Sequence, residues 1–329
     1  MSLRFTTHDS RFTLLIAGAV LVAATTSPAA QGYPTKPVRF IVPFAPGGGN
    51  DIIARMLGQK LGESWHQQVV IDNRPGAGGN IAAETTARAA PDGHTVFQFN
   101  VANAIAVSVY RKLAYDPVRD FAAITQLASS PFILVVHPSV RAGSVKEFVA
   151  LAKSQPGKLN YASSGNGGST HLVTEMFKTL AGIEMTHVPY NGAAPALTDA
   201  LGGQVQMMFA VPATATPHLK SGKLRALGIS SLKRSPLAPD LPTVAESGVP
   251  GFEGATWYGV VAPVRTSAPI VAQLNRDIVR VLRTPEVQDR LATQGVEVVG
   301  SAPAEFAQFI RSEIPKWAKA ARISGARVD

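Results

Sequence analysis

The sequence feature that most constrains the fold is a corner between an apolar run and a helical pattern. Residues 38–42 (VRFIV) form a β-like run, and residues 52–61 have the apolar spacing of a helix. Between them, residues 43–51 (PFAPGGGND) contain two prolines that stiffen the chain and three glycines that allow a sharp turn. We expect Asn50 or Asp51 to cap the helix. Uncovered N–H groups at such a helix start attract an anion without a cationic side chain, whereas a capped tight turn is the alternative interpretation.

Glycine-bearing corners of this kind recur along the chain, and each leads into a helical pattern. They follow strand-like runs at 68–72, 159–163 and 185–188, and they occupy residues 73–80 (NRPGAGGN), 164–170 (SGNGGST) and 189–192 (PYNG). The strands that alternate with helices predict parallel pairing with right-handed crossovers, in particular for the β-α-β-α-β unit that ends with a strand at 95–99. Ligands of such sheets bind at the carboxyl ends of the strands. The sequence therefore predicts an α/β fold whose cleft is lined by backbone donors.

A chain of 329 residues is long for one core and suits two lobes. We expect residues 132–255 to form the second lobe, and residues 33–131 together with 256–329 to form the first. The chain returns to the first lobe through a strand at 257–262. Helices follow at 269–282, 285–293 and 303–323, and we expect Pro315 to kink or split the last of them.

The N-terminus has the layout of a cleaved export signal. Arg4 and Arg11 precede an apolar stretch at 12–24, which gives way to small residues. The stretch is short for a membrane span, and no second long apolar run follows. We expect residues 1–30 to be a signal peptide, with cleavage after Ala29, Ala30 or Gly32, and the remaining protein to be exported.

Composition and motifs argue against several other classes of function. The chain has no cysteine, which excludes disulfides and thiolate chemistry, and its formal net charge of +9 comes from basic residues spread along the sequence. We therefore expect no nucleic-acid partner. The glycine corners complete neither G-x-G-x-x-G nor a P-loop, and no G-x-S-x-G elbow occurs. His171 and Glu175 have a spacing that can hold a metal, but without H-E-x-x-H we expect a side-chain contact, and we expect neither a metal nor a cofactor.

Five motifs in order carry a resemblance to a known family. They are PFAPGGGND at 43–51, NRPGAGG at 73–79, HVPYNGAAPA at 187–196, GKLRAL at 222–227 and LPTVAE at 241–246. The chain resembles, over almost its whole mature length, the substrate-binding proteins of tripartite tricarboxylate transporters, the Bug family. The resemblance implies a two-lobed periplasmic-binding-protein fold of the type II-like, Venus-flytrap kind, with a central mixed sheet in each lobe and a two-segment hinge, which closes on a small carboxylate.

The resemblance also implies a set of ligand-binding residues. The first lobe would supply Phe44 as an apolar wall, Gly47 and Gly48 as N–H donors, and Asp51 as cap and organiser of water. Further residues of the implied site in the two lobes are Pro46, Gly76, Ala77, Gly78, Ser163, Ser164, Gly165, Gly168, Ser169, Thr170, His171, Tyr190 and Asn191. Ala210 stands where many members have aspartate, an acid that in amino-acid-binding relatives can pair with the ligand ammonium. We therefore predict a preference for a carboxylate without an amino group.

The function implied is that of a monomeric periplasmic receptor which delivers a mono-, di- or tricarboxylate to the membrane components of the transporter. One alternative is a ligand sensor that signals to a membrane sensor kinase. A further alternative is an exported enzyme acting on carboxylates, with His171 as base near Ser163, Ser164 and Ser169. Serines at helix starts are, however, more typical of caps than of nucleophiles.

Overall fold

The computed structural model describes residues 1–2, 32–235, 238–293, 295–324 and 327. The predicted signal peptide lies outside the described residues except for its first two, and so do the cleavage positions at Ala29 and Ala30. From Gly32 to Asp329 the chain forms one compact unit. The lobe boundaries predicted above therefore stay a prediction, and the description below follows the sheets.

In the described part of the chain, the first sheet has six strands in the order β11-β4-β10-β3-β1-β2. Strands β1, β2 and β3 pair in parallel, which confirms the predicted β-α-β-α-β unit. Strand β10 lies antiparallel between β3 and β4, and β11 is antiparallel to β4, so the sheet is mixed. The bounds are β1 Val38–Val42, β2 Val69–Asn73, β3 Thr95–Asn100, β4 Phe121–Pro131, β10 Ala255–Pro263 and β11 Glu297–Val298.

The second sheet is built from the middle of the chain, and its five strands within the described ranges have the order β7-β6-β8-β5-β9. Strand β6 is parallel to β7 and β8, whereas β5 is antiparallel to β8 and β9. The bounds are β5 Ile133–Val136, β6 Asn160–Ser163, β7 Thr186–Pro189, β8 Met207–Ala210 and β9 Arg225–Ile229. This sheet is also mixed, as predicted.

Most helices lie where the sequence predicts them. Two were not predicted, α3 and α7, nor were strands β4 and β11. Helix α10 continues past Pro315, so of the two predicted effects of this proline, a kink or a split, the split does not occur, and the kink stays a prediction. The helices are α1 Gly49–Trp65, α2 Asn80–Ala87, α3 Val101–Val109, α4 Val145–Ser154, α5 Ser169–Ala181, α6 Ala193–Leu201, α7 Pro212–Lys220, α8 Ala268–Leu282, α9 Pro285–Ala292 and α10 Pro303–Ser324.

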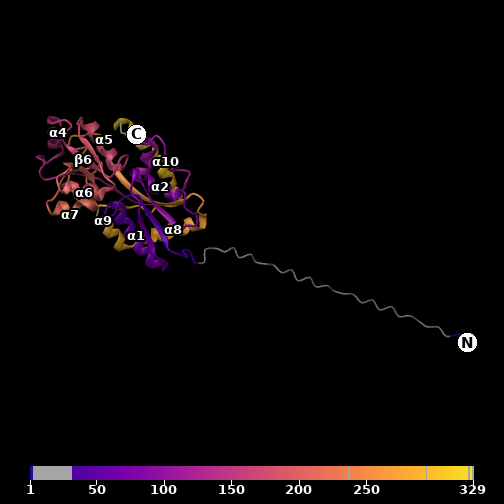
Figure 1. The fold of residues 1–329 in the computed structure, drawn as a ribbon. Helices are drawn as coiled ribbons and strands as arrows, with labels where there is room; N and C mark the ends of the chain where they lie inside the picture. Colours follow the sequence, from indigo (N-terminus) through magenta and orange to yellow (C-terminus); the bar gives the residue numbers. More distant parts are fainter. Residues whose placement is uncertain (3–31, 236–237, 294, 325–326, 328–329) are drawn as a thin grey trace. The chain divides into compact units, whose positions relative to one another are not determined.

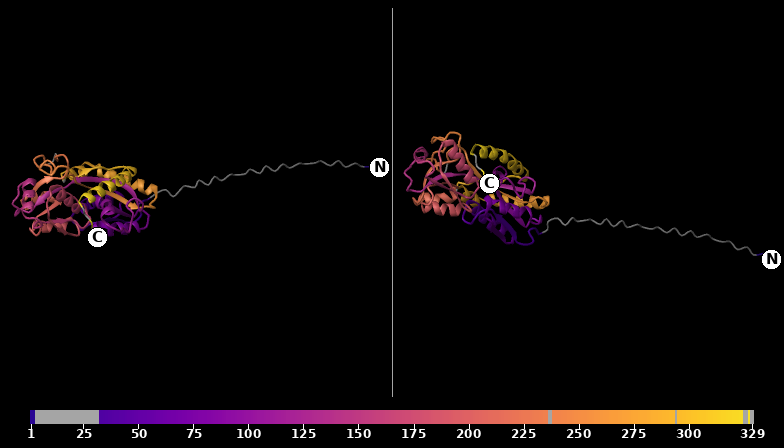
Figure 2. Two further views of the ribbon diagram at one scale, coloured as in Figure 1. Left: turned by 90° about the horizontal axis from the view of Figure 1, so that it is seen from above. Right: turned by 45° about the horizontal axis from the view of Figure 1, so that its top comes forward.

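The start and the end of the unit share one side, and the middle of the chain forms the other. In Figure 1, α1, α2, α8 and α10 lie on the side of the indigo and yellow segments, whereas α4, α5, α6 and α7 lie opposite. Figure 2 shows the same division from two further sides. Helix α10 packs against α3 and β4 of the first side and against α5 of the second. The last helix therefore joins the two halves of the unit.

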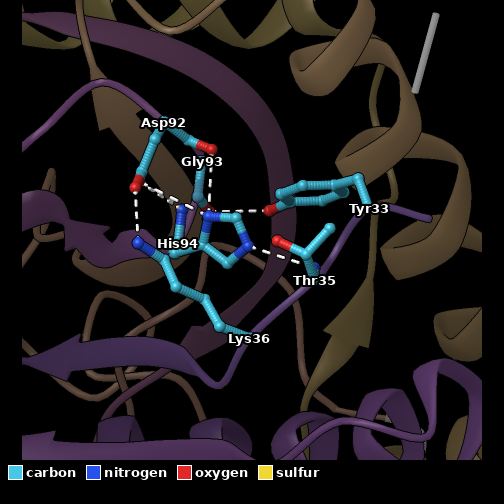
Figure 3. A network of polar contacts seen from close by, with 6 residues as sticks. All are labelled: Tyr33, Thr35, Lys36, Asp92, Gly93 and His94. Carbon is cyan, nitrogen blue, oxygen red and sulfur yellow. Dashed lines mark hydrogen bonds and ion pairs between the residues drawn. The ribbon is translucent and has the colours of Figure 1, made fainter. Parts of the chain in front are cut away.

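A network of hydrogen bonds and an ion pair connects residues 33–36, near the start of the unit, to the loop before β3 (Figure 3). The Tyr33 hydroxyl donates to the Gly93 carbonyl at 2.6 Å, and Lys36 Nζ lies 2.9 Å from Asp92 Oδ2. The Thr35 N–H donates to the His94 ring at 3.3 Å. Each predicted cleavage position precedes Tyr33, so each would leave this network intact.

Candidate functional site

Three helix starts meet at a small cavity of about 40 Å³, here called the inner cavity. Helix α1 begins at Gly49, α5 at Ser169 and α6 at Ala193, and all three residues line it. The remaining lining residues are Phe44, Gly48, Asn50, Asn100, Phe132, Ser164, Thr170, Phe209, Ala210, Val211, Thr256 and Tyr258. Because each of these helices follows a strand of its sheet, the glycine corners bring their first turns together.

The inner cavity offers backbone donors and no charged side chain. Within the described ranges, no residue accepts a hydrogen bond from the N–H groups of Gly49, Asn50, Ser169 or Thr170. None of the lining side chains is ionisable near neutral pH. Unpaired N–H groups at helix starts carry partial positive charge, so their convergence favours a small anion such as a carboxylate.

A larger cavity of about 320 Å³, here called the outer cavity, adjoins the inner one. Phe44 and Ser164 line both, which makes the two cavities neighbours. The other lining residues of the outer cavity are Gly76, Ala77, Gly78, Tyr110, Gly165, Asn166, Pro189, Tyr190 and Asn191. Ala77 has φ of 47°, a left-handed conformation that is uncommon for a residue with a Cβ and is found preferentially at functional sites.

The two halves of the unit touch across the outer cavity. The Tyr110 hydroxyl at the end of α3 donates to the Asn166 carbonyl at 2.8 Å, and the Ala45 N–H donates to the Asn191 carbonyl at 3.2 Å. A Cβ on Gly78 would lie 2.7 Å from the Asn166 carbonyl oxygen, so the two corners approach as closely as glycine allows. The cavity is therefore bounded by both halves.

The start of α1 differs from the prediction. Its N-cap is Gly48, so neither Asn50 nor Asp51 caps the helix. Asp51 lies in the first turn, where its Oδ2 accepts from the Gly47 N–H at 2.9 Å and from Arg55 at 2.8 Å. Burial opposes ionisation, but these bonds outweigh it and lower the pKa of Asp51. Because Gly47 already donates to Asp51, its N–H is not available to a ligand, contrary to the expectation.

Two stacked histidine rings form hydrogen bonds with the corner after β6. His171 Nδ1 accepts from the Gly167 N–H at 3.1 Å, and its ring stacks on that of His187 with centroids 4.1 Å apart. His187 Nε2 lies 2.6 Å from Ser163 Oγ, and this hydroxyl oxygen accepts from the Gly165 N–H at 3.2 Å. The two histidines thus position the loop that lines both cavities.

The structure brings most of the predicted ligand-binding residues to the two cavities. Those that line one or both are Phe44, Gly48, Gly76, Ala77, Gly78, Ser164, Gly165, Ser169, Thr170, Tyr190, Asn191 and Ala210. The predicted residues that line neither cavity are Pro46, Gly47, Asp51, Ser163, Gly168 and His171. The last six belong to the same corners and act through hydrogen bonds or turn geometry.

Sequence reasoning missed several lining residues. Tyr110 ends a helix that was not predicted, and Asn100 lies at the end of β3, where the rule that ligands bind at the carboxyl ends of strands could have found it. Thr256 and Tyr258 come from the antiparallel strand β10, whose pairing with β3 is not visible in the sequence. Trp257, on the same strand, lines neither cavity and is buried between Phe99 and the side chains of α10.

The stacked histidines predict a pH-dependent stability. Burial lowers the pKa of His187 to about 3, and the neighbouring His171 and Lys178 act in the same direction. Burial also lowers the pKa of His171, with Glu175 opposing. The unfolded chain protonates these rings near pH 6.5, but the folded chain only at lower pH. The free energy of unfolding therefore falls as the pH drops from about 6.5 towards about 3, and this contribution is constant above that window.

The measurement is Tm against pH between 7.5 and 4.5 for the wild type and for His187→Gln. Removal of the titrating ring is expected to make the fall in Tm shallower. His218→Gln is the control, because His218 lies on α7 outside the stack. Equal slopes for the wild type and His187→Gln would contradict the role given to this ring.

Among the described helices, none has both the length and the apolar character that crossing a bilayer requires. Nor do the described residues include a group of three or more histidines and carboxylates placed to hold a metal ion. The Glu175 carboxylate instead accepts from the Tyr161 hydroxyl and pairs with Lys178 at 2.7 Å.

Comparison with known proteins identifies the family. A family model described as tripartite tricarboxylate transporter family receptor matches residues 53–325. The Bordetella pertussis protein BugT is 36% identical over 301 residues, which cover 91% of this chain and 92% of BugT. An R. palustris protein solved with adipate is 37% identical, with a TM-score of 0.87 over 90% of this chain and 100% of that chain. The periplasmic binding protein BugD is 34% identical, with a TM-score of 0.87 over 90% and 99% of the two chains. The chain therefore belongs to the tripartite tricarboxylate transporter receptor family, and it has the two-lobed fold of that family's periplasmic solute-binding proteins.

Proposed function

We propose that this receptor captures a small carboxylate in the inner cavity, through backbone N–H groups at the starts of α1 and α5. The observation that carries the proposal is the convergence of unpaired first-turn N–H groups on a cavity without an ionisable side chain. The helix dipoles favour a negative charge there. Family membership, and the adipate in a relative that is 37% identical, support a carboxylate as that anion.

The ligand is proposed to lack an amino group. Ala210 is 2% exposed, ends β8 and lines the inner cavity. An ammonium group beside the bound carboxylate would be desolvated against a methyl side chain and against helix starts of like partial charge. A de-aminated carboxylate avoids this cost, so succinate is expected to bind more tightly than aspartate.

Closure of the two halves on the ligand is proposed to signal occupancy to the membrane partner. The inner cavity takes its donors from α1 on one side and from α5 on the other, and direct bonds such as that between Tyr110 and Asn166 already join the two sides. A ligand that contacts both halves favours the closed population. We propose a monomer that is exported to the periplasm by residues 1–30 and delivers its ligand to the membrane components of a tripartite tricarboxylate transporter.

The test is a thermal-shift panel on the mature protein with mono-, di- and tricarboxylates, aromatic acids and amino acids. A ligand at a hundred times its Kd is expected to add about 2.7 kcal/mol to the free energy of unfolding. An aspartate shift larger than the succinate shift would contradict the preference argued from Ala210. If none of the acids changes Tm, the proposal that this protein captures a carboxylate is wrong.

A further inference from the structure

The outer cavity has an aromatic wall and no counter-ion. Phe44, Tyr110 and Tyr190 line it, and loop residues complete it. None of its lining residues in the described structure is Asp, Glu, Lys, Arg or His. At about 320 Å³ it is much larger than the inner cavity of about 40 Å³. The part of a ligand that extends beyond its carboxylate would therefore meet rings and peptide groups.

Both tyrosine hydroxyls of this wall already donate hydrogen bonds to acceptors within the protein. Tyr190 donates to Asp199 Oδ2 at 2.6 Å, and Tyr110 donates to the Asn166 carbonyl at 2.8 Å. Their protons are thus used within the protein, and the rings remain as the surface offered to a ligand. Asp199 also places a negative charge at the hydroxyl end of Tyr190, which disfavours a second anion nearby.

Backbone donors of the outer cavity do not replace the missing cation. The backbone N–H groups of the outer cavity from which no described residue accepts include those of Gly76, Ala77, Gly78, Asn166 and Asn191. All of them precede the N-caps Gly79, Gly168 and Gly192, so they lie outside the first helical turns that direct a dipole at the inner cavity. A second carboxylate would therefore lose its water without an equivalent partner, whereas a neutral ring would not.

An aromatic ligand body matches this wall better than an aliphatic chain of similar size. A ring packed against Phe44, Tyr110 or Tyr190 buries apolar area, and aromatic pairs gain binding energy beyond that area. A flat ring also loses less conformational freedom on binding than a flexible chain.

We infer that this receptor selects carboxylates with a single negative charge and an aromatic body, whose carboxylate lies in the inner cavity and whose ring lies against the wall of the outer cavity. The inference rests on the proposed function, because it assigns the carboxylate to the inner cavity. It separates this chain from the relative solved with adipate, which is an aliphatic dicarboxylate.

The experiment is isothermal titration calorimetry at pH 7.5 with two matched pairs of acids. Hexanoate and adipate share a six-carbon chain, and 4-methylbenzoate and terephthalate share a ring; within each pair only the second carboxylate differs. We expect the monoanion of each pair to bind at least about tenfold more tightly, and 4-methylbenzoate to bind most tightly of the four. Adipate or terephthalate binding as tightly as its monoanion would overturn the inference and leave the proposed function standing. No binding by any carboxylate would contradict the proposed function itself.

Substitutions in the outer cavity test whether the aromatic ring of the ligand binds there. Tyr190→Leu is expected to weaken 4-methylbenzoate more than hexanoate, because the leucine keeps apolar contact but removes the ring. Asn191→Lys adds a cation to the lining, and the Asn191 side chain makes no hydrogen bond with a described residue. We expect this change to raise the affinity for terephthalate relative to 4-methylbenzoate by about tenfold.

Gln308→Lys is the matched control, since it adds the same charge on an exposed position of α10 that lines neither cavity. It is expected to leave the ratio of the two affinities unchanged. If Asn191→Lys also leaves that ratio unchanged, the ring end of the ligand lies elsewhere and the assignment of the outer cavity is wrong.

Discussion

Ala210→Asp is expected to reduce the affinity for de-aminated carboxylates by about 100-fold or more, which corresponds to ~2.7 kcal/mol. The new carboxylate would lie in the inner cavity, within a few ångströms of the place proposed for the ligand carboxylate. Two like charges about 4 Å apart repel by ~4 kcal/mol at an effective dielectric constant of about 20, so the estimate of the loss is conservative. The measurement is the Kd of succinate by calorimetry.

The same substitution is expected to reverse the preference between an amino acid and its de-aminated analogue. In the variant, the introduced carboxylate could pair with a ligand ammonium, so aspartate should bind more tightly than succinate. Ala210→Asn is the matched control, because asparagine has nearly the size of aspartate without its charge. If the asparagine variant loses as much succinate affinity as the aspartate variant, the effect is steric. The electrostatic account of Ala210 then fails.

The fold could be predicted where local sequence and tertiary packing agree. The runs 38–42 and 95–99 are largely apolar, as buried parallel strands require, and the glycines between strand and helix set the direction of α1 and α5. Those same corners predicted the inner cavity, because ligand sites of α/β sheets lie at the carboxyl ends of strands.

Other parts could not be predicted because their sequence shows no period or breaks a local rule. Helix α3 (VANAIAVSV) is buried on nearly all sides, so its apolar residues mark no face. Helix α7 contains Pro212 at its start and Pro217 inside, a composition that argues against a helix. The antiparallel position of β10 depends on pairing with strands more than a hundred residues away.

At the site, the hydrogen-bond partners of the side chains could not be predicted from the sequence. Asp51 was expected to cap α1, but its carboxylate instead accepts from Gly47, Arg55 and Asn73. His171 was expected to contact the ligand, and it supports the loop through Gly167. In both cases the side chain lies at the corner where the sequence places it, and its hydrogen-bond partner follows from the folded geometry of that corner and its neighbours.

A buried carboxylate on α10 is expected to be the largest single contributor to stability among the polar groups joining that helix to the first sheet. Glu313 is 5% exposed, and its Oε2 accepts from the indole N–H groups of Trp257 on β10 at 2.7 Å and Trp317 on α10 at 2.8 Å. Lys316 lies 3.4 Å from the other carboxylate oxygen but is itself 60% exposed. The two buried indole donors therefore depend on Glu313.

Glu313→Ala is expected to lower the free energy of unfolding by about 3–5 kcal/mol, because it leaves two buried N–H groups without acceptors and removes packed atoms. Glu313→Gln keeps one acceptor oxygen and should lose less, about 1–3 kcal/mol. Gln308→Ala, an exposed change on the same helix, is the control and should stay within about 0.5 kcal/mol of the wild type. Urea unfolding followed by far-ultraviolet circular dichroism measures all three, since tryptophan fluorescence would itself respond to the change. A loss below about 1 kcal/mol in Glu313→Ala would show that the two indoles find other acceptors, and that α10 is held by its apolar contacts with α3, β4 and α5 alone.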